Sequence, residues 1–148
     1  MSQQQQLTVP GRYDQIRAVC EFVAAGAKAA QFDEDAIFHI ELACDEACTN
    51  IIEHAYGSED AGPIMVKWQI ISDRFIITFT DKGDAFDPDT IPMPPSPQAI
   101  TNLDDLDNLK VGGLGLHFMK KLMDDVAFQF DKKEGNQLIM VKHLKGAT

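Results

Sequence analysis

The stretch Asp45-Glu46-Ala47-Cys48-Thr49-Asn50 lies within the longest helical pattern of the chain. Glu46 and Asn50 are four residues apart, so on a helix they stack on one face, one turn apart. Magnesium prefers oxygen ligands and commonly takes several of them from substrate phosphates and water. We therefore predict Asn50 as a magnesium ligand and Glu46 as a general base that takes a proton from an attacking hydroxyl group. The alternative is a solvated helix face without a role.

The helical pattern around this stretch begins with acids at Asp33-Glu34-Asp35, which favour the start of a helix, and runs to about Tyr56. Gly57 is a plausible terminator. The apolar stripe of this helix recurs at helical spacing. It comprises Ile37, Ile40, Cys44, Ala47, Cys48, Ile51 and Ala55.

Further elements follow on both sides of this helix. We expect a short strand at 6–9, a helix at 12–30, a hairpin of strands at 64–71 and 74–80, a helix from about 113 to 123, and strands at 126–130 and 137–141 joined by a turn at 134–136. The order is β-α-α-β-β-α-β-β. It predicts an α+β fold, a two-layer α/β sandwich with helices on one face of a mixed β-sheet.

A second candidate site lies at Asp81-Lys82-Gly83, where a predicted strand ends. A carboxylate there can accept a hydrogen bond from the exocyclic amine of adenine, a charged hydrogen bond worth about 1.5–3 kcal/mol. Gly83 has no side chain that would block the base. We predict that Asp81 and Gly83 bind ATP, while the alternative is a loop that only turns the chain.

A glycine run, Gly112-Gly113-Leu114-Gly115-Leu116, directly precedes an apolar-periodic helix. Glycine inside a helix costs about 1 kcal/mol, so such a run indicates that the backbone approaches a ligand. Because N–H groups at a helix start bind phosphate well, Gly112, Gly113, Leu114, Gly115 and Leu116 are candidates for a phosphate-binding segment. A flexible hinge is the alternative. No Gly-Lys-Ser/Thr follows, which excludes a Walker loop.

Between these two motifs, residues 84–111 change in character. Five of the seven prolines lie between Pro88 and Pro97, and acids follow at 104, 105 and 107. A loop of this length inside a compact domain is usually functional or disordered, so we interpret it as a lid over the nucleotide. We expect residues 1–148 to form a single ATP-binding domain.

Composition limits the function further. The net charge of −10 argues against a nucleic-acid partner, because neutralising phosphates needs clustered Lys and Arg. Three cysteines without a framework spacing predict reduced thiols, small core residues and a cytoplasmic location. No apolar run is long enough to span a membrane, and the N-terminus lacks the pattern of a signal peptide.

Together, these three segments resemble the N, G1 and G2 boxes of the gyrase, heat-shock chaperone, histidine kinase and mismatch-repair ATPase superfamily, which has the Bergerat fold. Glu46-Ala47-Cys48-Thr49-Asn50 is similar to the Glu-Ala-x-x-Asn of the small anti-sigma-factor serine kinases. The motif Asp81-x-Gly83-x-x-Phe86-Asp87-Pro88 and the closing Gly135-Asn136-x-Leu138 extend the resemblance. It covers the chain from about Leu7 to Leu144. Asn136 stands where many relatives have a Thr that helps to form the adenine pocket.

The resemblance implies a serine/threonine protein kinase that uses ATP and Mg²⁺. Glu46 would be the general base, Asn50 the magnesium ligand, Asp81 the adenine acceptor, and residues 112–116 the phosphate-binding segment. The implied partners are a small anti-anti-sigma antagonist protein as phosphoacceptor, a sigma factor or other regulator, and a second copy of the chain. An ATP-binding module without catalysis remains an alternative. A histidine kinase fragment is disfavoured, because we see no upstream helix with a phosphoacceptor histidine.

Overall fold

The computed structural model describes residues 3–84, 115–131 and 135–144. In chain order the elements are β1 (Gln3–Pro10), the 3-10 turn η1 (Tyr13–Gln15), α1 (Ile16–Ala29), α2 (Glu34–Asn50), the π-helical segment η2 (Ile51–Tyr56), β2 (Pro63–Ile71), β3 (Arg74–Asp81), α4 (Gly115–Leu122), β4 (Asp125–Asp131) and β5 (Gly135–His143). The predicted order of helices and strands is confirmed.

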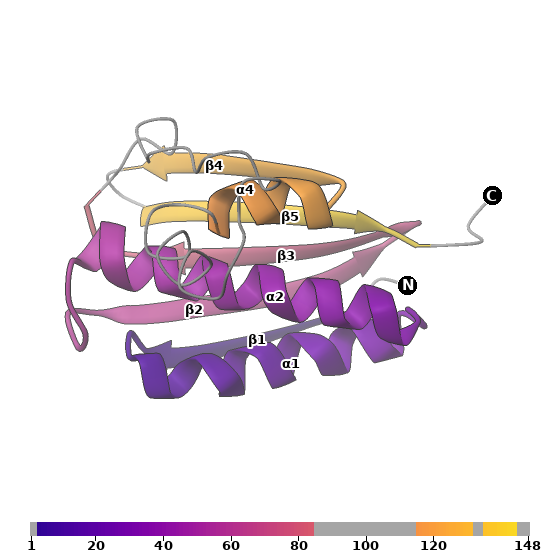
Figure 1. Cartoon of the computed structure of the whole chain (residues 1–148), viewed down its shortest axis with the longest axis horizontal. Coiled ribbons are helices and arrows are strands. Elements are labelled where there is room, and N and C mark those ends of the chain that lie inside the picture. The colour runs from indigo at the N-terminus through magenta and orange to yellow at the C-terminus, as the bar shows by residue number, and fades with distance from the viewer. Residues whose placement is uncertain (1–2, 85–114, 132–134, 145–148) are drawn as a thin grey trace, which may run out of the picture.

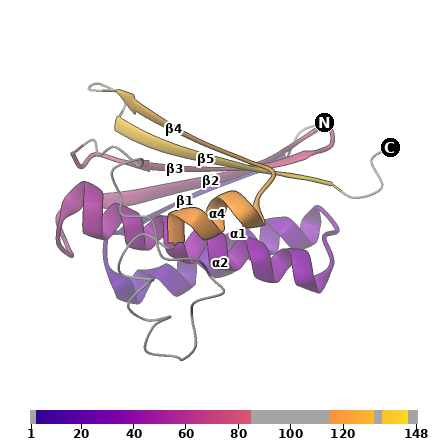
Figure 2. The same cartoon turned by 45° about the horizontal axis from the view of Figure 1, so that its top comes forward.

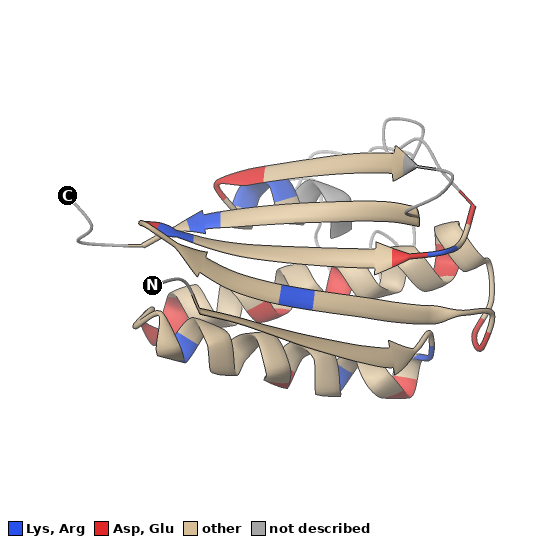
Figure 3. Cartoon of the chain, turned by 180° about the vertical axis from the view of Figure 1, so that it is seen from behind, with Lys and Arg blue, Asp and Glu red and all other residues tan. Residues whose placement is uncertain are grey.

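The strands form one five-stranded sheet in the order β1-β2-β3-β5-β4. Helices α1, α2 and α4 all lie on one face of this sheet, which gives two layers (Figures 1 and 2). Seen from behind, the sheet has no helix over it, and its charged residues lie mostly near strand ends and turns (Figure 3). The predicted α+β class and two-layer arrangement are therefore confirmed.

The predicted mixing of strand directions is wrong. Every strand pairing in the described residues is antiparallel. Two helices connect β1 to β2, so the second helix returns the chain to the end where β1 finished. The hydrogen bond of 2.8 Å from Gly11 N to Gly62 O marks this meeting point. Strands β3 and β4 do run in the same direction, but β5 is inserted between them and pairs antiparallel with both.

Helix α2 begins and ends where the sequence predicts. Asp33 is its N-cap, and the Asp33 side chain accepts a hydrogen bond of 2.8 Å from the backbone N–H of Ala36. After Asn50 the helix continues as the π-helical η2 and stops at Gly57, whose φ of 79° is in the left-handed region. A change to π-helical winding is rare and often occurs at functional sites. Here it starts directly after a predicted site residue.

The core lies between the helices and the sheet. The apolar stripe of α2 packs there with large side chains of the central strands, such as Phe75, Ile77 and Phe79. Cys44 and Cys48 are fully buried, as predicted for small core residues, while Cys20 is half-buried. Burying each large apolar side chain contributes about 1.5–3 kcal/mol, which holds α2 firmly against the sheet. Among the described residues, no helix has both the length and the apolar composition that crossing a membrane requires.

The predicted start of the last strand changes. Gly135 and Asn136 belong to β5 rather than to a turn, because Asn136 pairs with Phe130 on one side and with Asp81 on the other. The pairing of Gly135 with Asp131 of β4 extends the strand by one further residue. The described part of the third helix, α4, starts at Gly115, and residues 113 and 114 lie outside the described ranges.

Candidate functional site

Glu46 and Asn50 are both buried, with 6% and 5% of their surfaces exposed. The alternative of a solvated helix face is therefore wrong. Helix α4 packs against α2, so the side of α2 that does not face the sheet is also partly covered (Figure 2). Burying a carboxylate and an amide is costly unless each has a partner, so such an arrangement needs a reason.

Asp81 ends β3 and is the most buried acid among the buried polar residues, with 3% of its surface exposed. Its Oδ1 accepts two hydrogen bonds of 2.9 Å, one from the backbone N–H of Gly83 and one from Asn136 Nδ2. Burial raises the pKa of the Asp81 carboxyl above its ordinary value, and the two hydrogen bonds and the charge of Lys82 oppose this shift. Within the described residues both hydrogen bonds are accepted by Oδ1, so Oδ2 can still accept a hydrogen bond from another group.

Asn136 is a residue that our prediction did not place in the site. Besides Asp81, its Nδ2 donates to the backbone oxygens of Gly83, at 3.0 Å, and of Asp84, at 3.2 Å. Asn136 therefore fixes both the carboxylate and the turn that follows it. The signal available in the sequence was its position in Gly135-Asn136-x-Leu138, where many relatives have Thr.

Asn50 and Asp81 line the same narrow pocket, although they come from a helix and a strand. The other walls are Ala47, Ile51, Phe128, Phe130, Asn136, Gln137 and Leu138. About 10 Å³ of it is open to water, which is room for about one water molecule. Phe128 and Phe130 belong to the edge strand β4, which pairs on one side only. In this structure the pocket is therefore too small for a purine.

Glu46 is not among the residues that line this pocket. It lies one turn before Asn50 on α2, and it is as deeply buried. The structure therefore unites Asn50 and Asp81 in one pocket and places Glu46 next to that pocket along the helix.

Gly83 is required for packing as well as for access. A Cβ atom at this position would come within 2.6 Å of the backbone carbon of Ala55 in η2. The backbone N–H of Asp84 also donates to Ala55 O at 2.8 Å. The turn after β3 is thus held against η2, at the end of the long helix. This contact keeps the predicted motifs at 45–50 and 81–83 at a fixed distance from each other.

The phosphate-binding segment is only partly described. Gly115 and Leu116 are the first residues of α4, whereas Gly112, Gly113 and Leu114 lie outside the described residues. Of the predicted lid at 84–111, only Asp84 lies inside them. These assignments stay predictions.

One atom of the pocket lacks a partner. Asn50 Nδ2 is buried and makes no hydrogen bond, and Trp68 Nε1 is the other such side-chain atom in the described residues. An unsatisfied buried donor costs about 1–3 kcal/mol. An amide can donate to a phosphate oxygen or, after a half-turn, present its oxygen to a cation. The chemistry of the Asn50 side chain therefore suits a phosphate oxygen or a cation.

The chain is similar to known proteins over nearly its whole length. Residues 9–142 match the family model described as the histidine kinase-like ATPase domain. The chain is similar to "Serine-protein kinase RsbW" of Bacillus velezensis, with 32% identity over 141 residues, covering 95% of this chain and 86% of the relative. It is also similar to proteins of the same name from Listeria monocytogenes, with 34% identity over 137 residues, 88% of this chain and 85% of the relative, and from Bacillus subtilis, with 30% identity over 141 residues, 95% of this chain and 86% of the relative.

Proposed function

The chain belongs to the histidine kinase-like ATPase domain family, in the group of the serine-protein kinases RsbW, and from this premise we propose that it is an ATP-dependent serine/threonine protein kinase. Its substrate would be a small antagonist protein, and it would also bind a regulatory partner reversibly, as an anti-sigma-type factor. The observation that carries this proposal is the shared pocket of Asn50 and Asp81, which contains the unsatisfied Asn50 Nδ2.

In this proposal each buried polar residue has one task. Asp81 accepts a hydrogen bond from the adenine amine through Oδ2, while Gly83 and Asn136 hold the carboxylate through Oδ1. Asn50 is a protein ligand for Mg²⁺, which when bound would neutralise charge on the phosphates. The backbone of residues 112–116 wraps the phosphates.

Glu46 is the proposed catalytic base. A serine hydroxyl must lose its proton when its oxygen attacks a phosphoryl group, and a carboxylate within reach can accept that proton. Glu46 lies one helical turn from Asn50, so the base and the metal ligand move as one rigid unit on α2. A rigid element holds catalytic groups better than a loop does.

The test is transfer of labelled phosphate from ATP to a small antagonist protein. Glu46→Gln removes the base and keeps the shape, so we expect transfer to fall by about 10²–10⁴-fold. Glu34→Gln is the matched control, since Glu34 lies on the same helix but is exposed at its first turn. Equal transfer by Glu46→Gln and the parent protein would remove Glu46 from the mechanism.

The competing function is a binding module that uses ATP only as a switching ligand. The net charge of −10 and the predicted lid at 84–111 would suit such a role. Calorimetry that detects nucleotide binding, together with no phosphate transfer to any partner, would support that function over the kinase.

A further inference from the structure

The last residue of η2, Tyr56, reaches the turn that follows β3. Its hydroxyl group accepts a hydrogen bond of 2.9 Å from the backbone N–H of Lys82 and donates one of 2.6 Å to the backbone oxygen of Pro63, the first residue of β2. One side chain therefore joins the end of the long helix to two neighbouring strands. A hydroxyl group that donates and accepts at the same time restrains both of its partners.

The residue that Tyr56 binds, Lys82, lies between the two residues that we assign to the adenine contact. The N–H of Lys82 belongs to the peptide group that begins at Asp81, so this hydrogen bond fixes the orientation of that peptide. On the other side of the turn, the N–H of Asp84 donates to the backbone oxygen of Ala55, the neighbour of Tyr56, at 2.8 Å. The turn is thus held by η2 at two points, before and after its glycine.

A slot without side chains holds the Tyr56 ring in this place. A Cβ atom at Gly62 would come within 2.6 Å of Cε1 and 2.7 Å of Cζ and Oη. A Cβ atom at Gly11 would lie 3.5 Å from Cδ2 and Cε2, on the other edge of the ring. These two glycines lie after β1 and before β2, and they share a backbone hydrogen bond of 2.8 Å. The ring is therefore placed by segments that precede and follow the two helices in the chain.

The hydroxyl group of Tyr56 also lies close to Asp81. Burial raises the pKa of Tyr56 above its ordinary value, the hydrogen bond from the Lys82 N–H opposes this rise, and the negative charge of Asp81 adds to it. The phenol is therefore neutral at pH 7 and keeps the proton that it donates to Pro63. Tyr56 and the buried carboxylate are near enough for their charges to interact.

We propose that Tyr56 is a positioning residue for adenine recognition, which holds the turn after β3 so that Asp81 Oδ2 meets the exocyclic amine of the base. This inference rests on the proposed function, since it concerns the nucleotide that Asp81 binds. Gly83 N and Asn136 Nδ2 fix the carboxylate relative to its own turn and to β5. Tyr56 fixes that turn relative to the long helix, on which Asn50 lies. The base contact and the metal ligand are thereby kept at one spacing, which a nucleotide that bridges them requires.

The test compares ATP with purine riboside triphosphate, which lacks only the exocyclic amine of adenine. Calorimetry in the presence of Mg²⁺ gives the dissociation constant of each nucleotide, and the ratio of the two constants measures the amine contact. We expect a ratio of about 10–100 for the parent chain, because Asp81 accepts a charged hydrogen bond from the amine. A variant with a merely weakened fold binds both nucleotides less tightly and leaves this ratio unchanged.

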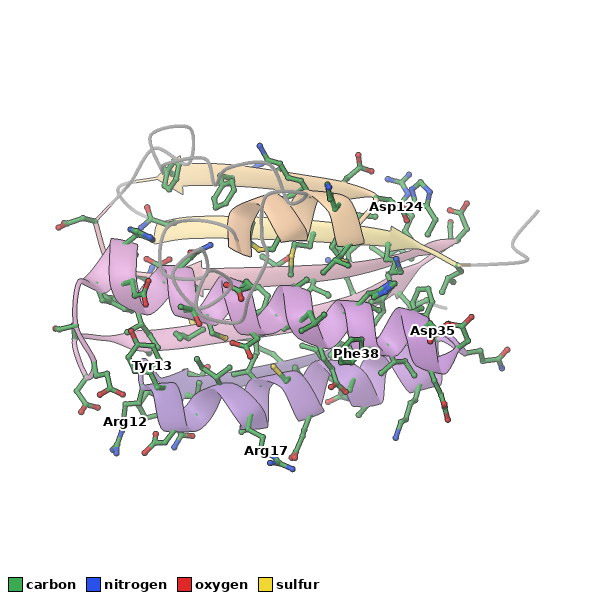
Figure 4. The ribbon with its side chains drawn as sticks, in the orientation of Figure 1. Arg12, Tyr13, Arg17, Asp35, Phe38 and Asp124 are labelled. Atoms are coloured by element: carbon green, nitrogen blue, oxygen red, sulfur yellow. The ribbon has the colours of Figure 1, made fainter. Side chains whose placement is uncertain are left out.

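Two variants displace the hydroxyl group in different ways. Tyr56→Phe removes it, and Gly62→Ala keeps it but places a Cβ atom 2.7 Å from Oη, so the ring must shift. In each variant the ratio should fall by about threefold to tenfold. Tyr13→Phe is the matched control, because the hydroxyl group of this other tyrosine donates to Glu53 of η2 at 3.3 Å. Tyr13 lies at the same end of the helix layer, beside the start of α1, and its variant should leave the ratio unchanged (Figure 4).

A double variant tests whether Tyr56 acts through Asp81. If it does, Asp81→Asn combined with Tyr56→Phe should bind ATP about as weakly as Asp81→Asn alone. Urea unfolding checks that each variant is folded. An unchanged ratio in folded Tyr56→Phe and Gly62→Ala, or fold-changes that multiply in the double variant, would overturn this inference and leave the proposed function intact. Equal affinity of the parent chain for both nucleotides would overturn the inference together with the adenine contact on which it rests.

Discussion

Replacing Asp81 with Asn separates the two roles of this buried carboxylate. In the variant, the side-chain oxygen can still accept from Gly83 N and Asn136 Nδ2, which are both 2.9 Å from Oδ1 in the parent. The second oxygen becomes an NH₂ group, which cannot accept from the adenine amine. A charged hydrogen bond is worth about 1.5–3 kcal/mol. Since each 1.4 kcal/mol is about tenfold, we expect ATP affinity to fall by roughly 10–100-fold.

The same variant should not destabilise the fold. Burial raises the pKa of the Asp81 carboxyl, so the folded state favours the protonated form. The stabilising contribution of that form is present below the unfolded pKa and is lost as pH rises through the folded pKa. At pH 7 the ionised carboxylate therefore costs stability, and Asp81→Asn should unfold at an equal or higher urea concentration than the parent. The difference should shrink as the pH is lowered toward the unfolded pKa.

The assay pairs isothermal calorimetry with ATP and urea unfolding, both at pH 7. Asp84→Asn is the matched control, because Asp84 is exposed and its interaction with Asn136 uses the backbone oxygen. Unchanged ATP affinity in Asp81→Asn would refute the adenine contact. A clearly lower urea midpoint would refute the argument from the buried charge.

Three other expectations follow from burial and packing. Asn50→Leu replaces the unsatisfied Nδ2 with an apolar side chain of similar size, so urea unfolding should show equal stability or a gain of about 1 kcal/mol. Mg²⁺-dependent ATP binding should be lost in this variant. Retained binding would exclude Asn50 as a ligand. Gly83→Ala places a Cβ atom 2.6 Å from the Ala55 backbone carbon, so it should lower the free energy of unfolding by about 1–3 kcal/mol and lower the thermal midpoint. An unchanged midpoint would mean that the turn after β3 is not held against Ala55. The pKa of Cys20 is raised to about 12, so the stability that the neutral thiol contributes is complete below pH 9 and is lost as pH rises toward 12. Iodoacetamide at pH 8 should therefore alkylate Cys20 far more slowly in the folded chain than in the urea-unfolded chain. Equal rates would contradict a neutral, shielded thiol.

Much of the fold could be predicted because its signals are local. The spacing of Ile40, Cys44 and Ala47 defines the helix that faces the sheet, Asp33 caps it, and Gly57 ends it. The alternation of Phe75, Ile77 and Phe79 likewise defines the inner face of β3. Such patterns act over a few residues of chain and need no knowledge of what lies opposite.

The sequence alone therefore determined the order of the elements, the face of α2 that enters the core, and the pairing of Glu46 with Asn50 on one helical side. Only the tertiary structure decided that this side is buried, that Asn136 fixes Asp81 from 55 residues away, and that every strand pairing is antiparallel. It also decided that Tyr56 reaches the turn after β3. The physical reason is that periodicity tells which side chains share a face, whereas the covering of that face depends on segments that are distant in the chain and meet it only when the layers pack.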